Sequence, residues 1–391
     1  MNYRTLNNPD NLSTLGFGCM RFPKKGNGFD HDEIERELKY AIDNGVNYFD
    51  TAYLYPGNEE AFGRAVERLG VRDGIKIATK MPHYFMKNTE EAEKRFEEQL
   101  RRLRTDHVDY YLMHMLPDVK SWNALCDRGI DKWLEQKKAE GRIRRVGFSF
   151  HGSSDLFIRI LHSYDWEFAQ IQYNYIDVNT QAGEKGLKEA ASMGIPVIIM
   201  EPLRGGRLVN GIPEKAREMI TDSTGGWSAA EFGLRWLWNQ PEVTTVLSGM
   251  NTMDMVAENI RIASDMKERS LTESQLDTYE KVVAIIESKT KVRCTGCGYC
   301  MPCPAGVDIP GCFKTYNTSY VENYANGIRE YFMCTAMKNE TAMASQCVKC
   351  GACEKKCPQG IHIRDELVKV KKRFENPVFK IMKFFAPGHI K

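Results

Sequence analysis

The sequence predicts an α/β protein in which a closed (β/α)8 barrel precedes a smaller, mainly helical domain. Eight short apolar, β-rich runs alternate with amphipathic helical stretches over roughly the first 250 residues. Ten of the 12 cysteines lie after residue 290, so the composition changes sharply there. We therefore expect a barrel over residues 1–288 and a second domain over residues 289–391.

The eight apolar runs have the length and the spacing that a barrel requires. The predicted strands are 14–19, 46–50, 75–80, 108–114, 145–149, 169–173, 195–200 and 243–248. Helical patterns separate them, for example 32–43, closed by Asn44-Gly45, and 90–103. Eight strand–helix units favour a (β/α)8 barrel. A doubly wound open sheet is the alternative, but no GxGxxG follows the first run, which disfavours it.

Composition and charge indicate an ordinary globular protein. Lys+Arg 54 against Asp+Glu 52 gives a net charge of +2, so no overall basic field indicates a nucleic-acid partner. The N-terminus lacks a cationic segment followed by an apolar one, and the apolar run 195–200 is far too short to span a membrane. We expect a soluble, cytoplasmic protein. Residues 291–391 carry 16 Lys/Arg and 8 Asp/Glu, so a basic second domain follows an acidic barrel.

Polar residues stand at the ends of three neighbouring predicted strands. Asp50 ends the second strand, Lys80 the third and His114 the fourth, while Tyr55 follows Asp50 by five residues. The carboxyl ends of the strands carry the chemistry in this fold. A lone polar residue there is more often structural, but four ionisable or phenolic groups together indicate an active site.

Several segments resemble those of the aldo-keto reductase superfamily, in order, over roughly residues 3–270. They are FDTAYLYPGNEEAFG (49–63), ATK (78–80), YYLMH (110–114), GFS (147–149), QIQYN (170–174), EPLRGG (201–206) and LSGMNTMDMVAEN (247–259). The resemblance implies reduction of an aldehyde or ketone with NADH or NADPH, or the reverse reaction. It also implies a catalytic tetrad of Asp50, Tyr55, Lys80 and His114.

Elementary chemistry explains why such a tetrad suits carbonyl reduction. Hydride transfer to a carbonyl develops negative charge on its oxygen, so a proton donor must stand beside it. A free phenol has a pKa near ~10. We expect the ammonium of Lys80 to lower the pKa of Tyr55, with Asp50 holding Lys80 in place. His114 would orient the substrate carbonyl.

The resemblance also implies a set of cofactor contacts. Ser149 and Gln172 match residues that hold the nicotinamide carboxamide, and Met200 stands where an aromatic ring usually stacks. Positions 203–206 match the pyrophosphate segment. Positions expected at a 2′-phosphate carry no charge here, which leaves NADH against NADPH open. The full predicted set is Met20, Asp50, Ser149, Gln172, Met200, Leu203, Gly205, Gly249, Asn251, Glu258 and Asn259.

Two cysteine runs dominate the second domain. Each has four cysteines at short spacing and ends in Cys-Pro, which resembles the two-cluster bacterial ferredoxin pattern. The 43 residues between the runs, with a helical stretch at 321–331, suit an α-helical ferredoxin. The resemblance implies two [4Fe-4S] clusters, in which the last cysteine of each run serves the other cluster. The ligand sets are then Cys294, Cys297, Cys300 and Cys357, and Cys347, Cys350, Cys353 and Cys303.

Other interpretations of these cysteines are weaker. Four-thiolate zinc sites also use CxxC pairs, but they do not explain two successive runs that end in Cys-Pro. Disulfides are not expected without a secretory signal. The first run has two residues, not three, before its last cysteine, which weakens the assignment of Cys303. Cys312 and Cys334 are expected to be buried thiols.

The two halves together allow more than one function. In one hypothesis, the protein is a carbonyl reductase that acts on a small carbonyl or alcohol substrate, and its clusters exchange electrons with a ferredoxin-like carrier. In another, the clusters are structural or sense redox state. The alternative from a different class is an electron-transfer or partner-docking iron–sulfur protein whose barrel is not an efficient carbonyl reductase. The substrate and the direction of reaction stay open.

Overall fold

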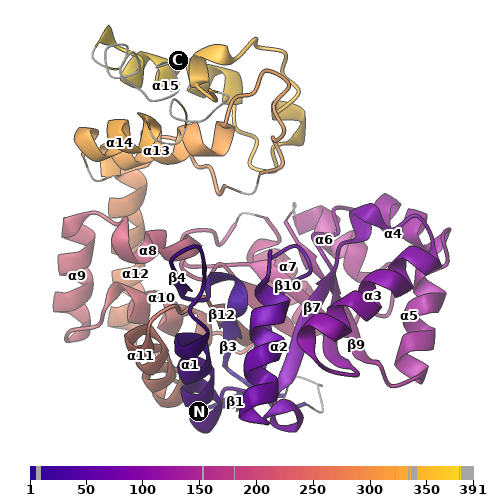
Figure 1. The fold of residues 1–391 in the computed structure, drawn as a ribbon. Coiled ribbons are helices and arrows are strands. Elements are labelled where there is room, and N and C mark those ends of the chain that lie inside the picture. Colours follow the sequence, from indigo (N-terminus) through magenta and orange to yellow (C-terminus); the bar gives the residue numbers. More distant parts are fainter. Residues whose placement is uncertain are drawn as a thin grey trace. The chain divides into compact units, whose positions relative to one another are not determined.

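The computed structural model describes residues 1–5, 10–151, 154–179, 181–296, 298–321, 323–332, 335, 341–377 and 379. The chain forms two compact units (Figure 1). The first comprises Met1–Gly205 and Ala230–Leu271, and the second comprises Gly206–Ala229 and Thr272–Lys391. The second unit therefore begins before position 289, and it also includes a segment, Gly206–Ala229, that lies between barrel strands in the sequence. The predicted boundary at 288/289 stays a prediction.

The first unit is a closed barrel of eight parallel strands, as predicted. Each strand pairs with its neighbours in chain order, and the last, β12, pairs with the first, β3. Because all eight strands are parallel, their carboxyl ends lie at one end of the barrel. The strands are β3 (Leu15–Gly18), β6 (Tyr48–Asp50), β7 (Lys76–Met81), β8 (Val108–Met113), β9 (Ile143–Phe150), β10 (Phe168–Gln172), β11 (Val197–Met200) and β12 (Val243–Ser248).

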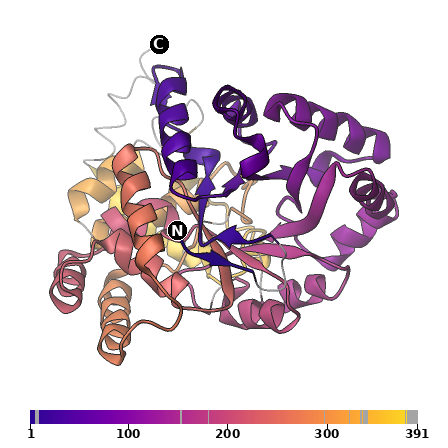
Figure 2. The ribbon, with the colours of Figure 1, turned by 90° about the horizontal axis from the view of Figure 1, so that it is seen from below.

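Helices surround the strands of this unit (Figure 2). Side-chain caps begin several of them: Asp30 accepts from the N–H of Glu33, and Asn88 from that of Glu91. Short 3₁₀ turns, η1 (Cys19–Arg21) and η3 (His83–Phe85), follow β3 and β7. The helices are α1 (His31–Asp43), α2 (Asn58–Leu69), α3 (Thr89–Leu103), α4 (Val119–Cys126), α5 (Ile130–Ala139), α6 (Ser154–Leu161), α7 (Gly183–Ser192), α10 (Ala229–Trp238) and α11 (Met253–Asp265).

Large side chains fill the inside of the barrel. The ring of Tyr110 contacts Tyr48 and Phe168 edge-on, with centroid distances of 5.1 Å and 4.9 Å. Leu12, from the hairpin of β1 (Tyr3–Arg4) and β2 (Leu12–Ser13), packs into the same cluster. A second hairpin, β4 (Lys24–Lys25) with β5 (Gly28–Phe29), follows η1. The barrel is therefore packed inside and offers room for chemistry at its loops.

The second unit is mainly helical, as predicted. The predicted helix 321–331 is wrong in extent, because α13 ends at Val321 and α14 begins at Tyr324. The side chain of Asn323 accepts from the N–H of Asn326 and caps the new helix. The helices are α8 (Arg207–Asn210), α9 (Glu214–Thr224), α12 (Glu273–Lys289), α13 (Ile309–Val321), α14 (Tyr324–Tyr331) and α15 (Ile363–Phe374), with the 3₁₀ turns η6 (Ala344–Gln346) and η7 (Glu354–Lys356).

In the part of the chain that the structure describes, no helix is both long and apolar enough to cross a bilayer. The predicted cytoplasmic location stays a prediction.

We predict that Gly63→Ala destabilises the barrel. A Cβ at Gly63, in α2, would lie 2.3 Å from the carbonyl oxygen of Arg102 and 2.6 Å from the carbonyl carbon of Leu103, both in α3. Overpacking of this kind costs about 1–3 kcal/mol, which exceeds the gain in helix propensity. Urea unfolding followed by tryptophan fluorescence measures the effect. Gly74→Ala, which has no atom within 4 Å of the new Cβ, is the control, and equal midpoints for the two variants would contradict the prediction.

Candidate functional site

The structure brings the four predicted catalytic residues together at the carboxyl end of the barrel. Lys80 Nζ lies 2.5 Å from Asp50 Oδ1 and donates to the carbonyl oxygen of Thr51 at 2.7 Å. The same Nζ lies 5.3 Å from the ring centroid of Tyr55. The rings of Tyr55 and His114 meet edge-on, with centroids 6.1 Å apart at 87°. Phenol, ammonium, carboxylate and imidazole therefore share one small region.

Lys80 and Asp50 form a buried ion pair. Their exposed fractions are 2% and 5%. Burial lowers the pKa of Lys80, but the charges of Asp50 and Tyr55 and the hydrogen bond to Asp50 together outweigh burial, and the net pKa is raised. Lys80 is therefore a permanent ammonium in the folded protein. Removing either partner would leave the other charge buried and uncompensated.

The pKa of Tyr55 departs from the expectation. Burial raises the pKa of the Tyr55 phenol, and the nearby charge of Lys80 opposes this only in part. The predicted net lowering is thus wrong, because desolvation of the phenolate exceeds the attraction of the ammonium. Tyr55 stays protonated at neutral pH, which is the form that a general acid needs.

His114 is neutral at physiological pH. Burial lowers the pKa of its imidazole to about 3, and the charge of Lys80 adds to that effect. Its Nδ1 is buried and has no hydrogen-bond partner among the described residues. His83, in η3, was not predicted: burial lowers its pKa to about 4, and both of its ring nitrogens lack a partner there too. Unsatisfied polar groups of this kind suit a polar ligand.

Gln170 is a further site residue that the sequence analysis missed. Its Nε2 donates to Asp50 Oδ2 at 2.9 Å, so it holds the carboxylate that holds Lys80. It also pairs in register with Ser149 on the adjacent strand. Gln172, the predicted residue, instead donates to Asp177 at 2.6 Å. Both glutamines face the same side because they are two residues apart on a strand. That spacing in the sequence could have identified Gln170 as a site residue beside Gln172.

The remaining predicted cofactor contacts also lie at or just beyond the carboxyl ends of the strands. Ser149 Oγ accepts from the N–H of Met115 at 2.8 Å, and Asn259 Nδ2 donates to Ser248 Oγ at 2.9 Å. Met20 is 62% exposed, and Met200 packs against the cluster inside the barrel. Leu203 and Glu258 are partly exposed, while Gly205, Gly249 and Asn251 are exposed. The predicted set therefore shares one end of the barrel with the tetrad.

A partly buried ion pair joins the loops that follow β10 and β11. Arg204 binds both carboxylate oxygens of Asp177, with its Nε at 2.6 Å from Oδ2. Asp177 also accepts from Asn174 and Gln172. Burial raises the pKa of Asp177, but the charge of Arg204 and the hydrogen bonds that Asp177 accepts together outweigh burial, and the net pKa is lowered. This network fixes the loop that carries Leu203.

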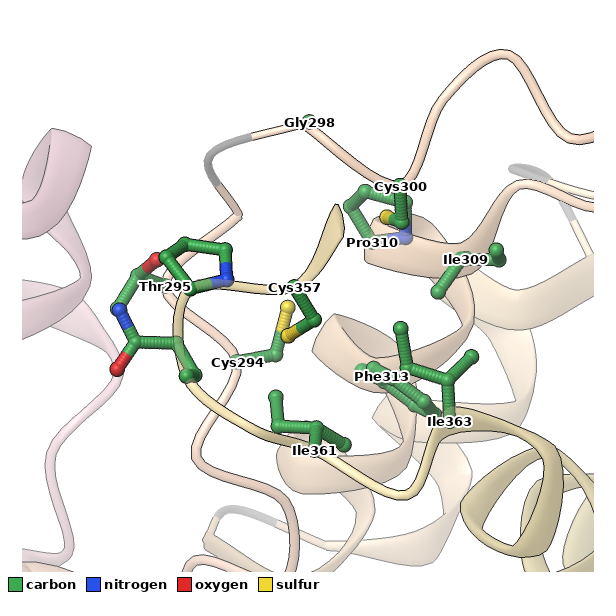
Figure 3. Close-up of a pocket in the computed structure, with 12 residues that line it drawn as sticks. Cys294, Thr295, Gly298, Cys300, Ile309, Pro310, Phe313, Cys357, Ile361 and Ile363 are labelled. Carbon is green, nitrogen blue, oxygen red and sulfur yellow. The ribbon is translucent and has the colours of Figure 1, made fainter. Parts of the chain in front are cut away.

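In the second unit, the cysteines gather around two cavities. Cys294 and Cys300 from the first run and Cys357 from the second line one cavity, together with apolar residues such as Ile309 and Phe313 (Figure 3). The thiols of Cys294 and Cys357 lie next to each other there (Figure 3). The other cavity is lined by Cys303, Cys347, Cys350 and Cys353. Each cavity thus takes cysteines from both runs, while Cys297 lies outside the described residues.

The backbone follows the same course in both runs. Gly296 and Gly298 have φ of +75° and +81°, and Lys349 and Gly351, at the same offsets, have +58° and +75°. These left-handed residues turn the chain between successive thiols. The N–H of Gly296 donates to Cys294 Sγ at 3.4 Å, a contact of the kind that tunes cluster potentials.

The cysteine thiols of the second unit line two cavities and do not converge on a single point. Within the described residues, no three Cys, His, Asp or Glu side chains converge closely enough to hold a single metal ion. Cys312 is buried, as predicted, and lines neither cavity. Cys334 lies outside the described residues.

We predict that His83 makes the protein sensitive to acid. Its pKa of about 4 lies below the value near 6.5 of an unfolded histidine, so the unfolded chain binds more protons between these pH values. Stability then falls by about 1.4 kcal/mol per pH unit as pH drops below 6.5. His83→Phe should remove this contribution, measured by urea unfolding between pH 7.5 and 5.5, whereas the contribution of His114, whose pKa is lowered to about 3, remains. A variant that loses stability as steeply as the wild type would contradict the prediction.

Comparisons with known proteins agree with both units. The aldo/keto reductase family profile matches residues 14–284, and a 4Fe-4S dicluster domain matches residues 293–362. L-galactose dehydrogenase of Arabidopsis thaliana is 25% identical over 299 residues, covering 71% of this chain and 93% of its own. An aldo-keto reductase of Mycolicibacterium smegmatis is 28% identical over 265 residues, covering 66% and 84%.

Two solved structures share the barrel. An aldo-keto reductase of Bacillus halodurans has a TM-score of 0.58 and 25% identity, covering 72% of this chain and 96% of its own. One of Klebsiella pneumoniae, in complex with NADPH, has a TM-score of 0.59 and 21% identity, with the same coverage. The chain therefore belongs to the aldo/keto reductase family, as an oxidoreductase with a 4Fe-4S dicluster domain after its barrel.

Proposed function

We propose that the barrel reduces an aldehyde or ketone to the alcohol, or catalyses the reverse, with NADH or NADPH as hydride carrier. The observation that carries this proposal is the assembly of Tyr55, Lys80, Asp50 and His114 at one end of the barrel. When bound, the nicotinamide supplies the hydride for the carbonyl carbon. A small carbonyl or alcohol is the substrate class that this chemistry requires.

The buried polar atoms near the tetrad fit a nicotinamide. The side-chain oxygens of Gln170 and Gln172 are buried without a donor among the described residues. A primary carboxamide carries two N–H donors, so it satisfies such oxygens. Ser149 lies beside Gln170 on the neighbouring strand and completes a polar set. The Klebsiella pneumoniae relative is in complex with NADPH, which supports a nicotinamide dinucleotide as the hydride carrier.

The residues of the tetrad divide the proton chemistry between them. Tyr55 gives its phenolic proton to the carbonyl oxygen as the carbon is reduced. The ammonium of Lys80 stabilises the phenolate that remains, and Asp50 and Gln170 keep that ammonium in place. Neutral His114 donates one N–H to the same oxygen and orients it. Solvent then returns a proton to Tyr55.

We further propose that the two cysteine cavities hold [4Fe-4S] clusters that exchange single electrons with a ferredoxin-like carrier. The ligand sets are Cys294, Cys297, Cys300 and Cys357, and Cys303, Cys347, Cys350 and Cys353. Thiolates are the ligands that such clusters use. The second cavity is open to a partner because Cys350 is exposed and the neighbouring Val348 is 70% exposed.

A second candidate is an electron-transfer or partner-docking protein whose barrel is not an efficient carbonyl reductase. The absence of charge at Gly249, Asn251 and Met255, where a 2′-phosphate is expected, favours it. The two candidate functions predict different effects of removing the phenol of Tyr55 on carbonyl reduction.

We predict that Tyr55→Phe lowers carbonyl reduction about 10²–10⁴-fold while NADH and NADPH still bind, because only the proton donor is lost. The measurement is kcat with a panel of aliphatic and aromatic aldehydes. Tyr53→Phe, in the same loop, is the control, since Tyr53 bonds Glu98 and not the tetrad. Unchanged turnover in Tyr55→Phe excludes Tyr55 as the acid. Wild-type protein without turnover on any aldehyde favours the second candidate.

We predict that the intact protein, purified anaerobically, contains about eight irons and that Cys357→Ser loses the cluster of the first cavity. Alkylation with iodoacetamide followed by mass spectrometry should then label Cys294 and Cys300 and spare Cys347. Labelling of Cys347, Cys350 and Cys353 instead would mean that each run binds its own cluster. Cys312→Ala should leave the iron content unchanged, and zinc in place of iron would end the cluster proposal.

A further inference from the structure

The two cysteine runs differ in charge although their backbones follow the same course. Both runs turn through left-handed residues at the same offsets. Residues 347–365, counted from the first cysteine of the second run, carry four Lys/Arg and two Asp/Glu, a net charge of +2. The matching residues 294–312 carry one Asp and no Lys or Arg, a net charge of −1. The cations of the second run therefore serve something other than the shape of the loop.

Lys349 shows this difference most sharply. Its φ is +58°, and the first run has Gly296 at the same offset. A side chain in the left-handed region carries backbone strain that glycine avoids. Lys349 is exposed and forms no ion pair with a side chain that the structure describes. Because no contact of this kind within the chain compensates the strain, we expect the charge to act on a partner outside the chain.

Two further lysines on the same loop are exposed and uncompensated. Lys355 and Lys356 lie in η7, and no carboxylate in the described part of the chain pairs with either. Glu354, the acid of this turn, is already bound by Arg364, whose Nε donates to Oε2 at 2.9 Å. A single exposed lysine is ordinary, but three of them within eight residues give the loop a positive rim.

The same loop has an apolar centre beside an exposed cluster ligand. Val348 is 70% exposed, more than any other large apolar side chain that the structure describes. It lines the second cavity together with Cys350, which is exposed. The described cysteines of the first cavity are partly buried. Electron tunnelling falls steeply with distance, so the second cavity gives a carrier the closer approach. An apolar centre with a polar rim is the usual composition of a protein interface.

We propose that residues 347–356, here called the docking loop, bind an acidic one-electron carrier protein, and that electrons pass through the cluster of the second cavity. The inference rests on the proposed function, which supplies the clusters. One electron leaves the reduced carrier and one oxidised cluster takes it up, with no proton or group transferred. Carboxylates of the carrier then face Lys349, Lys355 and Lys356, and the same charges repel a basic carrier.

The experiment uses the full-length, iron-loaded protein and a plant-type [2Fe–2S] ferredoxin as the acidic probe. Stopped-flow absorbance gives the second-order rate constant with which reduced ferredoxin passes its electron to the protein. Surface plasmon resonance gives the Kd of oxidised ferredoxin. In a variant that combines Lys349→Gln, Lys355→Gln and Lys356→Gln, the rate constant should fall and the Kd should rise about 10–100-fold at low salt, because electrostatic steering is lost. The difference should shrink as salt is added.

Two further variants serve as controls. Lys289→Gln, Lys371→Gln and Lys372→Gln together remove the same charge from exposed positions of α12 and α15 in the same unit, and this variant should behave as the wild type. Lys349→Gly removes one charge and relieves the backbone strain, so it should weaken ferredoxin binding without lowering the midpoint of thermal unfolding. Iron content and EPR spectra show whether each variant keeps its clusters.

The outcomes separate this inference from the proposed function. Slower reaction and weaker binding in the docking-loop variant alone support it. Wild-type rates and affinity in that variant overturn it, and a change of cluster potential without them would assign the lysines to tuning the cluster. Equal losses in the α12/α15 control also overturn it, because the net charge of the unit then attracts the carrier. Clusters that dithionite reduces but ferredoxin neither binds nor reduces overturn the docking loop alone. A protein without iron means that the cluster proposal fails and the inference falls with it.

Discussion

The candidate active site depends on the buried ion pair between Lys80 and Asp50. Two charges that are 2% and 5% exposed persist only because each compensates the other and because the groups around them supply hydrogen bonds. Thr51 and Gln170 supply those bonds, and they come from different strand ends. The pair in turn sets the electrostatics of its neighbours, because its ammonium opposes the ionisation of His114 and favours that of Tyr55.

The parallel barrel explains how residues far apart in the chain reach this pair. Every strand delivers its last residues to the same end, so Asp50 and Gln170 meet across 120 positions. The filled interior leaves that end as the place where polar groups gather. The same geometry brings Arg21, which follows β3, to Gly205, which follows β11.

The second unit also brings together residues that are far apart in the chain, in this case cysteines. Each cavity collects cysteines from both runs, so neither run is complete without the other. A hydride carrier moves two electrons together, whereas a [4Fe-4S] cluster moves one at a time. Under the proposed function, the barrel and the clusters would therefore perform separate steps, with a one-electron carrier as the partner of the clusters. The exposed Cys350 would give such a carrier a point of access.

The sequence by itself predicted the eight strands and the two cysteine runs, because periodicity and spacing are local properties of a chain, and the family resemblance pointed to the four candidate tetrad residues. Tertiary structure alone decided the rest. The pKa of Tyr55 is raised because the effect of burial is larger than the opposing effect of the Lys80 charge. The degree of burial of a side chain cannot be taken from a sequence motif. The role of Gln170 depends on a hydrogen bond to a residue 120 positions away. Such contacts form when the barrel closes. Local sequence patterns predict that the barrel forms, but they do not predict which side chains then contact one another.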